Sequence, residues 1–138
     1  FKKENKYPVV LTLNDHKISE NSFISGSKTI IPINVLHKTL PIFGYRIDNF
    51  AYITDAKTIP EAEVEKLKNL DVLVINALRI EPHVSHFNLK EALAFIKLVN
   101  PKKAYLTHIS HHLGFHDAVE KTLPDNVKIA YDQLQISI

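Results

Sequence analysis

The sequence predicts an α/β protein in which helices cover one face of a mixed sheet. Up to Thr54 the chain is rich in β-branched residues and turn signals, whereas after Asp55 apolar strands alternate with segments of helical periodicity. Strands followed by such an alternation are typical of layered α/β folds. No internal repeat or Pro/Gly/Ser-rich linker divides the 138 residues, so we expect residues 1–138 to form one structural unit.

The first part of the chain is predicted to be an antiparallel meander. Asp48-Asn49 is a two-residue turn signal, although the usual second-position glycine is missing, and it favours a hairpin between the strands on either side. The predicted strands are residues 7–13, 23–24, 28–36, 42–47 and 50–54.

The second part is predicted to alternate helices with buried strands. Pro60 suits a first helical turn, and Asn88 with Glu91 resembles a capping box that opens a helix ending at Asn100-Pro101. Residues 71–77 form a continuous apolar run, which is typical of a strand covered on both faces. The remaining predicted elements are a strand at 103–107, a helix at 116–122 and closing strands at 127–130 and 134–136.

Composition excludes several classes of function. With no cysteine, the chain has no disulfide, zinc ribbon, iron-sulfur cluster or thiol nucleophile, and any metal must be held by histidines and carboxylates. The net charge of +2 comes from 17 basic and 15 acidic residues spread along the chain, which argues against a dedicated nucleic-acid groove. No run approaches the roughly 18 apolar residues of a membrane span, and we expect a cytoplasmic protein. Residues 1–6 contain neither an initiator methionine nor a signal-peptide core, so the chain is expected to be a piece of a longer protein.

Three polar residues each follow an apolar strand. His37, Asp55 and His108 each come directly after one of the predicted strands. Strand ends of neighbouring strands meet at one edge of a layered α/β sheet, so these side chains are candidates for a site that binds zinc, manganese or iron. A histidine or aspartate after a strand is also a common turn former or helix cap, and spacing alone leaves that alternative open.

Six of the eight histidines fall between residues 83 and 116. His86 precedes the predicted helix N-terminus, where it could hydrogen-bond an anionic substrate or pass a proton to a leaving oxygen, but a solvated loop histidine fits equally well. His112 and His116 lie four residues apart and would share a helix face, which we expect to be a wet surface. His111 is a candidate to hydrogen-bond a metal ligand.

Four blocks of sequence, taken in order, resemble the second half of a metallo-β-lactamase-superfamily hydrolase. Within that superfamily the chain is most similar to the phosphodiesterase branch containing the phosphoribosyl cyclic phosphodiesterase of phosphonate degradation, and more distantly to the tRNA 3′-processing endonucleases. The resemblance covers residues 28–138 well and the first 27 residues poorly. The blocks are HKTLPIFGY at 37–45, YITD at 52–55, SHFNLKEAL at 85–93 and LTHISH at 106–111.

The resemblance implies a fold and a role for each candidate residue. The chain would be half of an αββα sandwich, with two divalent metal ions, zinc or manganese, at the edge between the sheets. His37 would bind one metal, Asp55 would bridge both, and His108 would bind the second. His86 would be the proton donor near the scissile phosphate, and His111 matches a family histidine of less certain role.

The family's principal metal motif, His-x-His-x-Asp-His, is absent from these 138 residues. We therefore expect the chain to be the C-terminal half of a protein whose N-terminal half is missing, and to be inactive alone. Its expected partners are that missing half, or a second copy that forms a homodimer through the exposed sheet face. The complete protein is expected to hydrolyse a small or cyclic phosphodiester with water activated on two metals.

Two other functions remain open from the sequence. One is a tRNA 3′-processing endonuclease, but the sequence contains no inserted basic arm that would hold tRNA, so we do not expect nucleic acid to be the substrate. The other is a non-catalytic half-domain that self-associates through its sheet and binds metal weakly through His37, Asp55 and His108.

Overall fold

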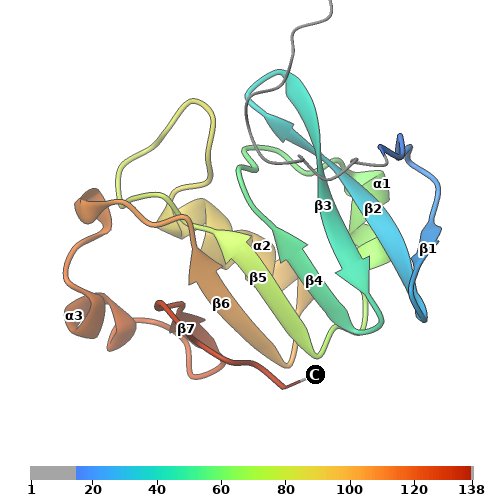
Figure 1. Cartoon of the computed structure of the whole chain (residues 1–138). Helices are drawn as coiled ribbons and strands as arrows, with labels where there is room; N and C mark the ends of the chain where they lie inside the picture. The colour runs from blue at the N-terminus through green and yellow to red at the C-terminus, as the bar shows by residue number, and fades with distance from the viewer. Residues whose placement is uncertain (1–14, 138) are drawn as a thin grey trace, which may run out of the picture.

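The structure, a computed structural model, describes residues 15–137 and contains a seven-stranded sheet in that range (Figure 1). The strands lie side by side in chain order, from β1 at one edge to β7 at the other. The predicted strand at residues 7–13 lies outside the described residues. The strands are β1 (Phe23–Ser25), β2 (Lys28–His37), β3 (Leu40–Ile47), β4 (Phe50–Ile53), β5 (Val72–Asn76), β6 (Lys103–Thr107) and β7 (Val127–Ile129).

The sheet is mixed, as predicted. Strands β1 to β4 pair antiparallel, whereas β4 to β7 pair parallel. The hairpin between β3 and β4 forms without a turn glycine because Asp48 itself adopts a left-handed conformation, with φ of 51°. Since β2, β4, β5 and β6 all run in the same direction, they end at the same edge of the sheet.

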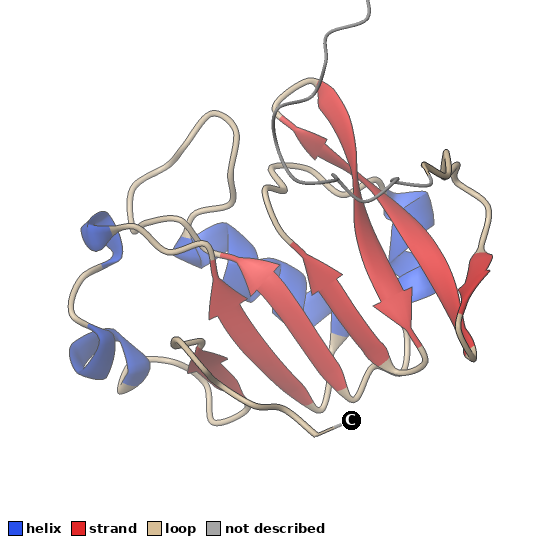
Figure 2. Cartoon of the chain, in the orientation of Figure 1, coloured by secondary structure: helices blue, strands red, loops and turns tan. Residues whose placement is uncertain are grey.

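Helices pack on one face of the sheet, as Figure 2 shows for α1 and α2 behind the strands. The capping box predicted for α2 is confirmed: the Asn88 side chain accepts from the Glu91 amide and the Glu91 side chain accepts from the Asn88 amide, both at 2.9 Å. The helix ends at Asn100 with φ of 53°. The helical elements are α1 (Glu61–Val64), the 3₁₀ turn η1 (Glu65–Leu67), α2 (Leu89–Val99), the 3₁₀ turn η2 (His111–Leu113) and α3 (His116–Glu120). None of the helices in residues 15–137 is long and apolar enough to cross a membrane.

The predicted closing strand at residues 134–136 is wrong. A turn at Asp132-Gln133, with φ of 69° at Gln133, redirects the chain after β7, and residues 134–137 join no ladder. Leu134 and Ile136 are only half-buried, so their apolar pattern reflects contact with the protein surface, not strand pairing.

The two faces of the sheet differ in what covers them. The face toward the helices carries the core, and its central residues Ile33, Ile53, Ile75 and Leu106 have no exposed surface. The opposite face carries an aromatic row across β3, β4 and β6, in which Tyr52 is 42% exposed. Pairing through that face remains a prediction.

Glu63 connects α1 to β2, the strand that ends at His37, through hydrogen bonds. Its carboxylate accepts from the Asn34 amide of β2 at 2.8 Å and from Lys66 Nζ at 2.8 Å. Burial alone would raise the pKa of Glu63, but these hydrogen bonds and the Lys66 charge outweigh burial and hold the pKa below its usual value.

We expect Glu63→Gln to lower the free energy of unfolding at pH 7 by about 1 to 3 kcal/mol, because a charge-assisted buried contact is lost. A lowered folded-state pKa stabilises the protein above the unfolded-state value and ceases to do so as pH falls through the folded-state value. The difference between wild type and variant, measured by urea unfolding, should therefore shrink below pH 4.5. Glu65→Gln is the matched control, since Glu65 pairs with Lys68 in solvent and should change stability by less than about 0.5 kcal/mol. Equal losses in the two variants would contradict this role.

Candidate metal centre

The candidate ligands lie at the sheet edge where β2, β4, β5 and β6 end. His37 is the last residue of β2, Asp55 follows β4, and His108 directly follows β6. Asp55 and His108 both adopt left-handed backbone conformations, with φ of 59° and 54°. Such conformations are costly for residues other than glycine and cluster at functional sites, where the surrounding structure holds them.

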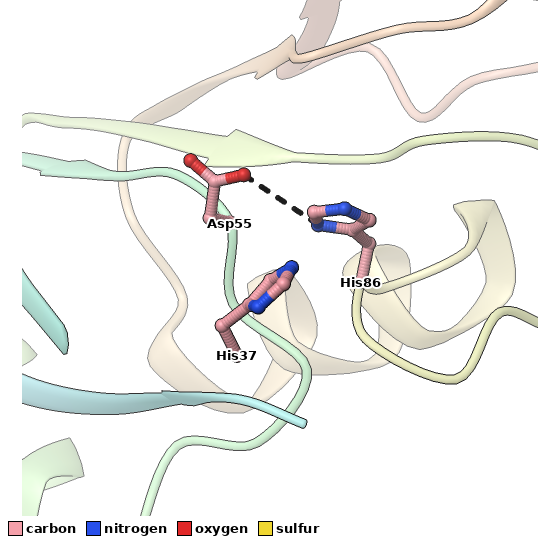
Figure 3. Close-up of side chains that lie close together, drawn as sticks. All are labelled: His37, Asp55 and His86. Carbon is pink, nitrogen blue, oxygen red and sulfur yellow. Dashed lines mark ion pairs between the residues drawn. The ribbon is translucent and has the colours of Figure 1, made fainter. Parts of the chain in front are cut away.

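The structure brings the three predicted ligands and His86 together. Single ligand atoms of His37, Asp55 and His86 all lie within 4.8 Å of one another (Figure 3). Asp55 Oδ1 is 3.7 Å from His86 Nδ1 and 3.4 Å from His108 Nε2, so one carboxylate oxygen lies beside two imidazoles. The convergence of strand ends expected from the sequence is confirmed, and His86 joins it from the loop between β5 and α2.

His86 occupies the middle of the cluster. Its ring centroid is 4.7 Å from that of His37, 4.8 Å from that of His108 and 5.0 Å from that of His83, on which it stacks. The His86 side chain is only 12% exposed, compared with 38% for Asp55 and His108. Its Nδ1 atom is buried and has no hydrogen-bond partner within residues 15–137. A buried polar atom without a partner calls for an explanation, and an ion at this position is one.

The electrostatic setting favours the neutral form of His86, which is the form that can bind a metal. Burial, and then the neighbouring His108 and His37, lower the pKa of His86, while Asp55 opposes the shift. The pKa of His83 is also lowered, by burial first and then by Arg79. A neutral imidazole has a free lone pair for a cation, whereas a protonated one has none.

The donor set fits a divalent transition metal. Three imidazoles and one carboxylate are ligands that zinc, manganese and iron accept. In a tetrahedral site, two donor atoms about 2.1 Å from the ion lie roughly 3.4 Å apart. The side-chain donor atoms, which lie within 4.8 Å of one another, would therefore have to approach by at most about 1.4 Å to share an ion.

The other histidines lie on the surface. His111 and His112 are exposed in η2, with their ring centroids 3.8 Å apart, and the role predicted for His111 stays a prediction. The shared helix face predicted for His112 and His116 is wrong, because Gly114, with φ of 111°, separates η2 from α3. His116 instead contacts acidic side chains of its own helix. The surface placement expected for both residues is confirmed.

Sequence reasoning missed two residues beside the site. His83 stacks on His86, and its only sequence signal is the His-x-x-His spacing. Asn76 is completely buried at the end of β5 and hydrogen-bonds the backbone of the residue after Asp55. Its signal is a polar residue in an otherwise apolar run.

A family model and one curated relative match most of the chain. Residues 2–109 match the family described as "Beta-lactamase superfamily domain". A curated relative, named "Octanoyltransferase", from Porphyromonas gingivalis (strain ATCC BAA-308 / W83), is 33% identical over 138 residues, which are 99% of this chain and 28% of that protein.

Solved structures show the same fold. One, described as "Crystal Structure of a New Diphosphatase from the PhnP Family", is 34% identical with a TM-score of 0.87, and the match covers 89% of this chain and 48% of that one. Human tRNase Z, short form, is 21% identical with a TM-score of 0.67, over 86% of this chain and 48% of that one, and shows the fold alone. The chain thus spans about half the length of these solved structures and 28% of the curated relative. Together with the seven-stranded mixed sheet and the histidine-aspartate cluster at its edge, these matches establish that the chain belongs to the metallo-β-lactamase superfamily.

Proposed function

We propose that this chain supplies part of the active site of a metal-dependent hydrolase that cleaves a small or cyclic phosphodiester. The observation that carries the proposal is the buried His86 Nδ1, without a hydrogen-bond partner in the described residues and within 3.7 Å of the Asp55 carboxylate. Such an arrangement suits a site that receives a cation and an anionic substrate. The likeness to a structure described as a diphosphatase supports phosphate-ester or phosphate-anhydride chemistry.

Each residue has a distinct task in this proposal. His37 and His108 supply imidazole donors, and Asp55, whose Oδ1 lies beside both His86 and His108, supplies the carboxylate donor of the centre. Bound divalent zinc or manganese would activate water and neutralise phosphate oxygens. His86 stands beside this centre, where the Asp55 carboxylate and a bound phosphate anion would favour its protonated form, and it would then give a proton to the leaving oxygen.

The remaining ligands come from outside these residues in this proposal. Three histidines and one aspartate are too few for two complete metal sites, and His-x-His-x-Asp-His is absent from the 138 residues. We propose that an N-terminal half with that motif covers the aromatic face of the sheet and completes the centre. A homodimer through the same face is the competing arrangement.

The test compares this chain with a protein that joins it to a segment containing His-x-His-x-Asp-His. We expect the joined protein, loaded with zinc or manganese, to hydrolyse bis(p-nitrophenyl) phosphate and a small cyclic phosphate, and this chain alone to show no turnover above background. The control is the joined protein treated with a chelator.

Two outcomes would overturn the proposal. Cleavage of precursor tRNA with no action on small phosphodiesters would favour the tRNA 3′-processing alternative. A metal-free dimer of this chain in light scattering, with no hydrolysis by the joined protein, would favour the self-associating half-domain.

A further inference from the structure

Asn76 makes an unusual pair of hydrogen bonds at the end of β5. The side chain has no exposed surface, in a strand whose other residues are all apolar. The Ala56 amide donates to Asn76 Oδ1 at 2.8 Å, and Asn76 Nδ2 donates to the Ala56 carbonyl at 2.9 Å. Both ends of the Asn76 amide are thus used on the backbone of a single residue, which fixes that residue against the end of β5.

The backbone of Ala56 contacts the segments that carry Asp55 and His86. Ala56 directly follows Asp55, which has a left-handed backbone conformation with φ of 59°. The same Ala56 carbonyl also accepts from the Phe87 amide at 2.8 Å, and Phe87 directly follows His86. Asn76 therefore holds a peptide on which the placement of both site residues depends.

Further hydrogen bonds lead from the Ala56 peptide toward the end of β6, which His108 follows. The Phe87 carbonyl accepts from the Leu78 amide at 2.9 Å. The Leu78 carbonyl in turn accepts from the Ser110 amide at 2.8 Å and from Ser110 Oγ at 2.9 Å. Ser110 lies two residues after His108, so one continuous set of buried and half-buried hydrogen bonds reaches all three segments around the site.

We infer that Asn76 is a positioning residue of the metal centre: through the Ala56 peptide it sets the distance between Asp55 and His86. This inference rests on the proposed function, because the distance matters only if the two side chains serve one centre. A merely structural Asn76 would stabilise the fold without affecting the site. Outer hydrogen bonds that orient metal ligands typically change metal affinity by about 10 to 100-fold when they are lost.

The test compares Asn76→Ala with Val127→Ala. Val127 is buried in β7 near the start of the parallel strands, so its truncation leaves a cavity away from the site. We expect both variants of this chain to unfold at lower urea concentration than wild type. Only Asn76→Ala should bind zinc about 10-fold or more weakly in calorimetry. If Asn76→Ala does not fold, Asn76→Asp replaces it in the test. Asn76→Asp keeps the side-chain shape and the acceptor for the Ala56 amide but loses the donor to the Ala56 carbonyl, so it should also weaken zinc binding.

A second measurement needs no metal. In the metal-free protein, nuclear Overhauser contacts between the rings of His37 and His86, whose centroids are 4.7 Å apart, should persist in Val127→Ala and vanish in Asn76→Ala. Zinc affinity and ring contacts that match those of wild type in the Asn76 variants would overturn the inference. Failure of wild type to bind zinc would instead count against the proposed function, and the ring contacts alone would then decide whether Asn76 positions His86.

Discussion

Asp55→Asn is expected to weaken binding of zinc or manganese by this chain on the order of 100-fold or more. The carboxylate oxygen lies 3.4 Å from His108 Nε2 and 3.7 Å from His86 Nδ1, and within the same cluster as His37. It is the only anionic group in that cluster, and an amide in its place offers a neutral oxygen that is a much weaker donor for these metals. Calorimetric titration of the metal-free chain with each metal measures the effect.

Asp71→Asn is the matched control for this change. Asp71 precedes β5 at the opposite end of the sheet, where its carboxylate pairs with Lys102 at 2.6 Å. Asp71→Asn removes one negative charge, as Asp55→Asn does. Any general electrostatic attraction of the protein for cations is therefore reduced to the same extent in both variants. Metal affinity should stay within about twofold of wild type in Asp71→Asn, a change of less than about 0.4 kcal/mol. If the two variants weakened binding equally, net charge and not a specific centre would explain the metal affinity.

The placement of His37, Asp55 and His108 could be predicted from the sequence because it depends on regular structure. Apolar runs mark the strands, and strands that run in the same direction end at the same edge. Only the chain direction and the strand ends are needed to bring such residues together. The same reasoning predicted the capped start of α2 at Asn88, where local side-chain chemistry decides the outcome.

The position of His86 could not be predicted in the same way. It lies in a loop of ten residues between Ala77 and Asn88, and its place depends on where that loop folds back. The return is fixed by hydrogen bonds from the Leu78 amide to the Phe87 carbonyl and from the Phe87 amide to the Ala56 carbonyl. These are contacts between segments distant in sequence, and no local pattern specifies them.

The wrong predictions share a related cause. Residues 134–136 have an apolar alternation that suits a strand, but the preceding turn leads the chain away from the sheet edge. His112 and His116 have helical spacing, but a glycine between them breaks the helix. In both cases a single backbone conformation, at Gln133 or at Gly114, overrides a pattern of side chains.

His86→Ala is expected to separate metal binding from turnover. In the proposed mechanism His86 donates a proton to the leaving oxygen, so the joined protein should keep its metal affinity within about threefold and lose roughly 10²- to 10⁴-fold in turnover of bis(p-nitrophenyl) phosphate. His37→Ala should instead lose metal and turnover together. Both rings lie in the same cluster, 4.7 Å apart, so the two variants remove the same chemical group from neighbouring positions.

The structure also defines the result that would reassign His86. Its Nδ1 is buried beside Asp55 and close enough to His37 to share an ion with both. If His86→Ala weakened metal binding as much as His37→Ala, His86 would be a metal ligand, and the proton donor would have to be sought elsewhere. His112→Ala controls for loss of a surface histidine and should change neither quantity, because His112 is exposed in η2. A proton donor and a ligand differ in which atom they face, so the ratio of affinity loss to rate loss assigns the role directly.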